Sequence, residues 1–138
     1  MNAKYVLDAC AMIAVLSKES GADKVVKVYQ KAVSGDVSLV MSKLNLLEVY
    51  YGLFREYGKE HANMFMDEVK RSPVVIRHEI SDEVFAEAGR LKALYRMSLA
   101  DAVALAEAFV SGAVLLTADH HEFDVVEEKE GLSFAWIR

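Results

Sequence analysis

The sequence predicts an α/β fold, a three-layer α/β/α arrangement around a mostly parallel central sheet of about five strands. Short apolar runs alternate with longer segments of helical periodicity along the chain. The run Ala113–Thr117 (AVLLT) is an uninterrupted apolar strand of the kind found buried in parallel sheets. With 138 residues, of which 54% are hydrophobic, and with no linker or internal repeat, residues 1–138 are expected to form one domain.

The first half of the chain is expected to contain two strands and four helices, delimited by capping and turn residues. Ser20 and Ser42 can cap helices through their hydroxyl groups, and Gly58 and Pro73 would end the two helices that follow Ser42. Those two helices are expected to pack as a hairpin. The predicted strands are Lys4–Asp8 and Ser38–Met41, and the predicted helices are Ala9–Leu16, a helix from the Ser20 cap to Val33, Lys43–Tyr57 and Lys59–Arg71.

The second half is expected to contain three further strands and two long helices. Ser81, followed by two acidic residues, is expected to cap a helix that ends near Tyr95, and Ser98 to cap the next helix. The predicted strands are Val74–Arg77, Ala113–Thr117 and Phe134–Ile137, and the second predicted helix is Leu99–Ser111.

Two aspartates follow predicted strands directly. Asp8 ends the first strand, and Asp119 lies two residues beyond Ala113–Thr117. In an open parallel sheet, ligands bind beyond the carboxyl ends of the strands, so both side chains are candidates for function at one edge. Each also has a local interpretation, because Asp8 suits a helix N-cap and Asp119 suits a turn that caps a short helix near Glu122.

Two more acidic residues lie on predicted helices. Asp101 occupies the first turn of an otherwise nearly all-apolar helix, where it faces the packed side. A carboxylate in that position needs a partner, although a capping box with Ser98 would also explain the residue. Glu48 lies on a narrow polar stripe whose commonest meaning is a solvated face. The other members of that stripe are Asn45, Gly52, Arg55 and Glu56.

Together, the four acids predict a metal site better than four separate local roles do. Carboxylates without a cysteine pair or histidines at metal-ligand spacing suit Mg²⁺ or Mn²⁺ and disfavour zinc. His120 and His121 are adjacent in the chain, so they are expected at the surface and not as zinc ligands. A net charge of −5 argues against nucleic-acid binding through a broad basic face. A bound cation would supply the positive charge that a phosphate needs.

Cysteine usage and hydropathy bear on the compartment. The single cysteine, Cys10, can form no internal disulfide, no apolar run is long enough for a membrane span, and the start of the chain lacks the layout of a signal peptide. A cytoplasmic protein is therefore expected.

The order and spacing of four motifs resemble the PIN domain, specifically the VapC-like toxins of toxin-antitoxin pairs. The motifs are YVLDACA, LLEVYYGL, SLADAVALAEA and LLTADHHEFD. The resemblance implies an endoribonuclease in which Asp8, Glu48, Asp101 and Asp119 hold Mg²⁺ or Mn²⁺. Thr117 matches a small hydroxyl position near the metal and Asp124 is an additional acid. Cys10 stands where the family often has serine or threonine, and a role as a small core residue is preferred for it.

The same resemblance implies an RNA substrate, a homodimer, and a cognate antitoxin with a segment in the acidic cleft. The basic residues expected to contact RNA are Lys18, Lys43, Arg55, Arg90 and Arg96. The residues that could form interfaces, if they are not core, are Tyr50, Tyr51, Leu53 and Phe54.

Three other functions compete with this one. One is a catalytically inactive PIN-like binding module, and another is a metal-dependent nuclease that acts on other nucleic acid. A phosphoacceptor of the response-regulator kind is disfavoured, because Ala9 rather than a second acid follows Asp8, and the third strand ends Ile76-Arg77-His78 without an aspartate.

Overall fold

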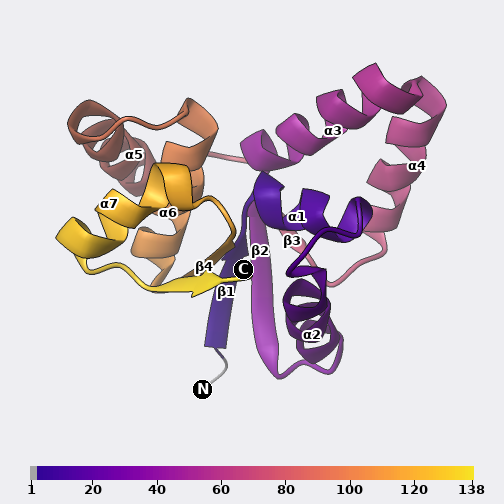
Figure 1. Ribbon diagram of the computed structural model, residues 1–138, viewed down its shortest axis with the longest axis horizontal. Helices are drawn as coiled ribbons and strands as arrows, with labels where there is room; N and C mark the ends of the chain where they lie inside the picture. Colours follow the sequence, from indigo (N-terminus) through magenta and orange to yellow (C-terminus); the bar gives the residue numbers. More distant parts are fainter. Residues whose placement is uncertain (1–2) are drawn as a thin grey trace.

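Five strands and seven helices follow one another in the computed structural model, which describes residues 3–138 (Figure 1). The strands are β1 Ala3–Leu7, β2 Val37–Ser42, β3 Val75–Arg77, β4 Val114–Thr117 and β5 Phe134–Trp136. The helices are α1 Ala9–Leu16, α2 Ala22–Val33, α3 Lys43–Tyr57, α4 Lys59–Lys70, α5 Asp82–Leu94, α6 Leu99–Ser111 and α7 His120–Glu130.

The strands form one sheet in the order β3-β2-β1-β4-β5, and every neighbouring pair is parallel. The predicted α/β fold with a parallel sheet of about five strands is therefore confirmed. The chain moves outward in one direction from β1 to β3 and then returns to the other side of β1 as β4. The carboxyl ends of β1 and β4 thus flank the point where the strand order reverses, which is where doubly wound sheets bind ligands.

Both faces of the sheet are covered by helices. Side chains alternate between faces along a strand, so Val6 and Leu115 pack in a core with α5, α6 and α7, while Leu7 and Leu116 pack in a second core with α1 to α4. Figure 1 shows these two helical layers on opposite sides of the strands. Helices α3 and α4 pack against each other as the predicted hairpin.

Three of the four serine caps that the sequence predicts are present. The hydroxyl groups of Ser42, Ser81 and Ser98 accept hydrogen bonds from the backbone N–H groups in the first turns of α3, α5 and α6. The prediction for α2 was wrong, because this helix begins at Ala22 with Gly21 as its N-cap and without a side-chain cap.

Gly21 is required by a tertiary contact as well as by its backbone. Its φ of +94° is unfavourable for residues with a side chain, and a Cβ there would lie 2.4 Å from the carbonyl oxygen of Ile137. The connection between α1 and α2 is thus fixed against the C-terminal end of the sheet. No helix among residues 3–138 combines the length and the apolar character that crossing a membrane requires.

Candidate metal centre

Asp8 follows β1 directly and is almost fully buried at the carboxyl edge of the sheet. Its Oδ1 accepts a hydrogen bond of 2.8 Å from the Ala11 backbone N–H, so the residue caps α1. Its Oδ2 is buried and has no hydrogen-bond partner among residues 3–138. Burial raises the pKa of Asp8 to about 6, the negative charges of Asp119 and Glu48 add to the rise, and the Thr117 hydroxyl and the Ala11 N–H oppose it.

Asp119 lies beside Asp8 because β1 and β4 are neighbours in register. Leu7 pairs with Leu116, so the residues that follow these strands share one edge. The Asp119 backbone N–H donates to Thr117 Oγ1 at 3.0 Å, and Asp119 Oδ1 accepts from the Glu122 backbone N–H at 3.2 Å. Asp119 therefore has the turn and cap role that the sequence suggested for it. That role uses Oδ1 and leaves Oδ2 outside the cap.

Asp101 reaches the same edge from the first turn of α6. The predicted cap is present, since Ser98 Oγ accepts from the Asp101 backbone N–H at 3.1 Å. Burial raises the pKa of the Asp101 carboxyl to about 7, and the charges of Asp119, Asp8 and Glu48 raise it further, with Ser98 opposing. The capping box does not account for this carboxylate, which lies among three other acids.

Glu48 approaches the cluster from α3 and is half-buried. Its pKa is raised by burial, an effect that Asn45 opposes and that the charge of Asp119 reinforces. The interpretation of this stripe as a solvated face was wrong for Asn45, which is fully buried and donates from Nδ2 to the Ala100 carbonyl oxygen at 3.1 Å. Asn45 thereby ties the start of α3, and with it Glu48, to the start of α6.

The tightest group of acids consists of Asp101, Asp119 and Glu122. One ligand oxygen from each lies within 4.8 Å of the others. Asp8 and Glu48 lie outside this group, although their charges act on it. Sequence reasoning missed Glu122, which follows Asp119 by three residues on the first turn of α7 and so lies on the same helix face.

The three accessory candidates differ in their placement. Thr117 is fully buried and positions the Asp119 backbone, as described above. Asp124 is exposed, and its Oδ1 lies 2.8 Å from His120 Nδ1, within hydrogen-bond distance. Its carboxylate is therefore engaged outside the group formed by Asp101, Asp119 and Glu122. Cys10 is half-buried, and burial, with Asp8 and Asp119 adding, raises the pKa of its thiol to about 11, which keeps the thiol neutral.

The basic and aromatic candidates are also placed. Arg90 is held between Glu87 and Glu130 with 2.6 Å contacts to each, and Arg55 lies 5.4 Å from the ring centroid of Tyr51. His120 and His121 are exposed, as predicted. Tyr51, Phe54 and Leu47 are exposed on α3, so this part of the helix is not core.

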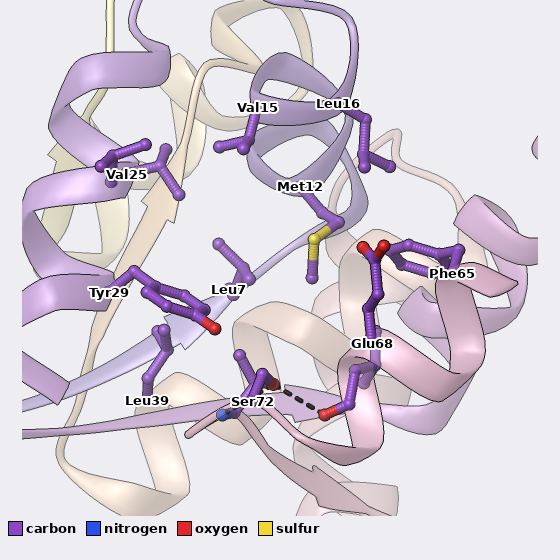
Figure 2. A pocket seen from close by; sticks show the side chains of 13 residues that line it. Leu7, Met12, Val15, Leu16, Val25, Tyr29, Leu39, Phe65, Glu68 and Ser72 are labelled. Atoms are coloured by element: carbon purple, nitrogen blue, oxygen red, sulfur yellow. Dashed lines mark hydrogen bonds between the residues drawn. The ribbon is translucent and has the colours of Figure 1, made fainter. Parts of the chain in front are cut away.

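A separate hollow of about 320 Å³ lies between α1, α2 and α4, and Figure 2 shows Met12, Leu7 and Tyr29 directed into it. Apart from Glu68 and Ser72 at one side, its lining is apolar or aromatic. It holds none of the clustered acids, so the chemistry of the carboxylates belongs to the sheet edge. The residues that line it are Leu7, Met12, Val15, Leu16, Val25, Val26, Tyr29, Leu39, Phe65, Glu68, Val69, Ser72 and Val74.

The carboxylate cluster fits a hard divalent cation. Mg²⁺ and Mn²⁺ prefer carboxylate oxygens and waters, and every candidate ligand here is a carboxylate. Burial, reinforced by repulsion among the acids, raises the pKa of Asp8 and Asp101 above the usual range, so a bound cation would compete with protons for these carboxylates. The unpaired Oδ2 of Asp8 offers one more buried acceptor.

The comparisons with known proteins concern the family and the fold of this chain. The family model described as PIN domain matches residues 5–129. No curated protein matches by sequence.

Among solved structures, VapBC-1 from nontypeable Haemophilus influenzae is 19% identical, with coverage of 97% of this chain and 98% of that chain and a TM-score of 0.71. DNA-bound VapBC from Salmonella typhimurium is 15% identical, with 99% of each chain covered and a TM-score of 0.72. VapC20 from Mycobacterium tuberculosis, a sarcin-ricin loop cleaving toxin, is 16% identical, with coverage of 93% and 95% and a TM-score of 0.64. At these identities the likeness concerns the fold, and together with the family match it establishes that this chain belongs to the PIN domain family and has the fold of solved VapC-type toxins.

Proposed function

We propose that this protein is an endoribonuclease that requires Mg²⁺ or Mn²⁺ and is the toxin of a toxin-antitoxin pair. The observation that carries the proposal is the convergence of acids from four separate elements at the β1 and β4 edge. Asp101, Asp119 and Glu122 supply a group of oxygens close enough to share one ion, with Asp8 and Glu48 beside it. The membership in the PIN domain family supports the nuclease class.

The chain's own residues divide the work at this edge. Asp101, Asp119 and Glu122 would hold the cation, and Thr117 and Ser98 fix the backbones of two of these residues. When bound, a divalent cation neutralises charge on a phosphodiester and makes water a stronger nucleophile at neutral pH.

Asp8 would orient a water molecule at this edge of the sheet and accept a proton from it. Its Oδ2 is buried and has no hydrogen-bond partner among residues 3–138, so it would accept a hydrogen bond from a group that enters the site, and its pKa of about 6 lets it take up a proton near neutral pH. Glu48, half-buried and positioned through Asn45, would carry a similar role from the opposite side.

RNA is the proposed substrate and a cognate antitoxin the proposed partner. One solved structure of the same fold is named as a sarcin-ricin loop cleaving toxin, and another, from Klebsiella pneumoniae, as a toxin-antitoxin complex. The exposed apolar side chains of Leu47, Tyr51 and Phe54 on α3 offer a surface for the predicted homodimer.

The test is cleavage of mixed cellular RNA by the purified chain with Mn²⁺, with Mg²⁺ or with a chelator. We expect cleavage that the chelator abolishes and that Asp101→Asn reduces by at least roughly 10²-fold, the scale of losing an electrostatic group of the site. Asp67→Asn, at an exposed aspartate of α4, is the matched control and should cleave at the normal rate.

The alternatives predict different outcomes in the same assay. Cleavage of single-stranded DNA in preference to RNA would favour a nuclease with another substrate. Binding of Mn²⁺ and RNA without cleavage would favour an inactive binding module, and equal cleavage by Asp101→Asn and the unchanged protein would contradict the proposed site.

A further inference from the structure

A hollow of about 450 Å³ adjoins the candidate metal centre. It lies between the connection from α5 to α6 and the first turns of α7, and it shares Glu122 with the group of three acids. Its lining is Tyr95, Arg96, Met97, His121, Glu122 and Val125. A ligand in this hollow would therefore lie directly beside an ion held by Asp101, Asp119 and Glu122.

Two basic side chains that have no partner among residues 3–138 line the hollow, Arg96 from the connection between α5 and α6 and His121 from α7. Arg96 and His121 are exposed and make no side-chain hydrogen bond or ion pair within the described part of the chain. Arg90 binds two glutamates and Arg138 contacts Glu19 and the Ser20 carbonyl, whereas in the described chain Arg96 is unpaired like Arg71 but, unlike Arg71, lines a hollow next to the acids. In a chain with a net charge of −5, a free guanidinium beside an acidic centre needs an explanation, and an anion such as phosphate is the ligand that its fork-shaped donors match.

The rest of the lining is suited to a flat, partly apolar group. Met97 is buried at the base of the connection, and Val125 exposes about half of its surface. The Tyr95 ring is fixed because its hydroxyl donates to Glu130, which Arg90 also holds. An aromatic side chain with a fixed orientation can stack on a nucleobase at little entropic cost.

We propose that this hollow binds one nucleotide of the RNA substrate next to the phosphodiester that is cut. Arg96, with His121 as a second donor, binds the phosphate of that nucleotide, and Tyr95, Met97 and Val125 contact its base. The proposal rests on the ribonuclease function proposed above and adds the residues that position the substrate. Arg96 is a positioning residue, because its contact is with the nucleotide beside the reacting phosphate.

Glu122 makes nucleotide binding dependent on the cation. Its carboxylate faces both the hollow and the group of acids, so it repels a phosphate as long as its charge is not neutralised. A divalent ion shared by Asp101, Asp119 and Glu122 removes that repulsion. Binding of RNA in the hollow should therefore tighten when Mn²⁺ is added, even in a protein that does not cleave.

The experiment compares Arg96→Ala and Arg96→Lys with Arg71→Ala, which removes the same charge from an exposed arginine at the end of α4, outside the hollow. Binding of a short fluorescein-labelled single-stranded RNA is measured by anisotropy with and without Mn²⁺, in the Asp8→Asn background to prevent cleavage. Steady-state cleavage is measured in the otherwise unchanged protein.

We expect Arg96→Ala to weaken Mn²⁺-dependent RNA binding and to raise KM by roughly tenfold, with kcat changed less than about twofold. The effects of Arg96→Lys should lie between those of the unchanged protein and Arg96→Ala, because lysine keeps the positive charge but lacks the fork-shaped donors of the guanidinium group. Arg71→Ala should change neither value by more than about twofold. Arg96 has no hydrogen bond or ion pair with any side chain of residues 3–138, so its removal should leave the thermal unfolding temperature unchanged.

Equal effects of Arg96→Ala and Arg71→Ala on RNA binding and KM would contradict the proposed nucleotide site. Metal-dependent cleavage, and thus the proposed function, would still hold in that case. A loss confined to kcat would also contradict the nucleotide site. If no variant cleaves but RNA binding still depends on Arg96 and Mn²⁺, the nucleotide site stands and the ribonuclease activity falls. Absence of both binding and cleavage refutes both.

Discussion

Replacement of Asp8 by asparagine should stabilise the metal-free protein at neutral and alkaline pH while impairing its function. The pKa of Asp8 is about 6, against 3.8 for an unperturbed aspartate, mainly because burial penalises the charged form. That difference corresponds to about 3 kcal/mol of folding free energy lost when the carboxyl is ionised. Asparagine has no charge to bury, and its Oδ1 can still cap α1 through the Ala11 N–H.

The sign of this effect fixes its pH range. The folded protein holds the Asp8 proton more tightly than the unfolded chain does, so the destabilisation is absent below about pH 4, grows between about pH 4 and 6, and is complete above. At about pH 8 the variant should unfold at a temperature higher by roughly 10 °C, and at about pH 3.5 the two proteins should unfold together.

Thermal unfolding followed by circular dichroism across this pH range is the assay, with chelator present and then with Mn²⁺. Mn²⁺ should raise the unfolding temperature of the unchanged protein more than that of Asp8→Asn, because the stabilisation by a ligand of the folded state grows with the logarithm of its affinity, and loss of the Asp8 charge beside the cluster lowers the affinity for a cation. Asp67→Asn, at an exposed site, should show no pH-dependent difference. If Asp8→Asn were less stable than the unchanged protein at about pH 8, the carboxylate would not be strained, and the reasoning would be refuted.

Four further outcomes are expected. Gly21→Ala should lower the free energy of unfolding by more than about 1 kcal/mol, measured by urea titration, because the new Cβ meets the Ile137 carbonyl at 2.4 Å from a backbone with φ of +94°; unchanged stability would contradict the contact. Asn45→Ala should cost about 1 to 3 kcal/mol in the same measurement, since a buried hydrogen bond to the start of α6 is lost. Arg90→Ala should cost less than about 1 kcal/mol in the same measurement, because this partly exposed side chain joins α5 and α7 through ion pairs near the surface. Calorimetry should find Mn²⁺ affinity at least roughly tenfold lower at about pH 6 than at about pH 8, as protons compete for the Asp101 carboxyl, whose pKa is about 7; an affinity independent of pH would place the ion elsewhere.

The elements that sequence reasoning predicted well depend on local chemistry. The hydroxyl groups of Ser42, Ser81 and Ser98 each need only a backbone N–H within three residues, so the starts of α3, α5 and α6 could be read from the chain alone. The glycine after α3 and the apolar run of β4 are similarly local. The parallel direction of β1 and β4 followed from the alternation of strands and helices, and it is the reason that Asp8 and Asp119 could be expected at one edge, whereas the direct pairing of these two strands was not predicted.

The features that the sequence did not predict depend on contacts between distant segments. Gly21 replaces a serine cap because it touches Ile137, which is far away in the chain. Asn45 looked solvated because it shares a helix stripe with charged residues, yet the packing of α3 on α6 buries it. Glu122 could have been found by one further step, since a residue three positions after a candidate ligand on the same helix shares its face.

The site and the hydrophobic core are coupled through α6. Ala102, Ala104 and Ala106 are fully buried, and their small side chains let this helix lie against the sheet at the edge where the acids meet. The same burial that stabilises α6 takes Asp101 out of water and raises its pKa. A more solvated α6 would lower the pKa of Asp101 but would hold a cation less firmly, because water screens both the repulsion among the acids and their attraction for the ion. We infer that the strain at Asp101 is a direct consequence of packing this helix, so the stability of the fold and the affinity for metal cannot be varied independently at this position.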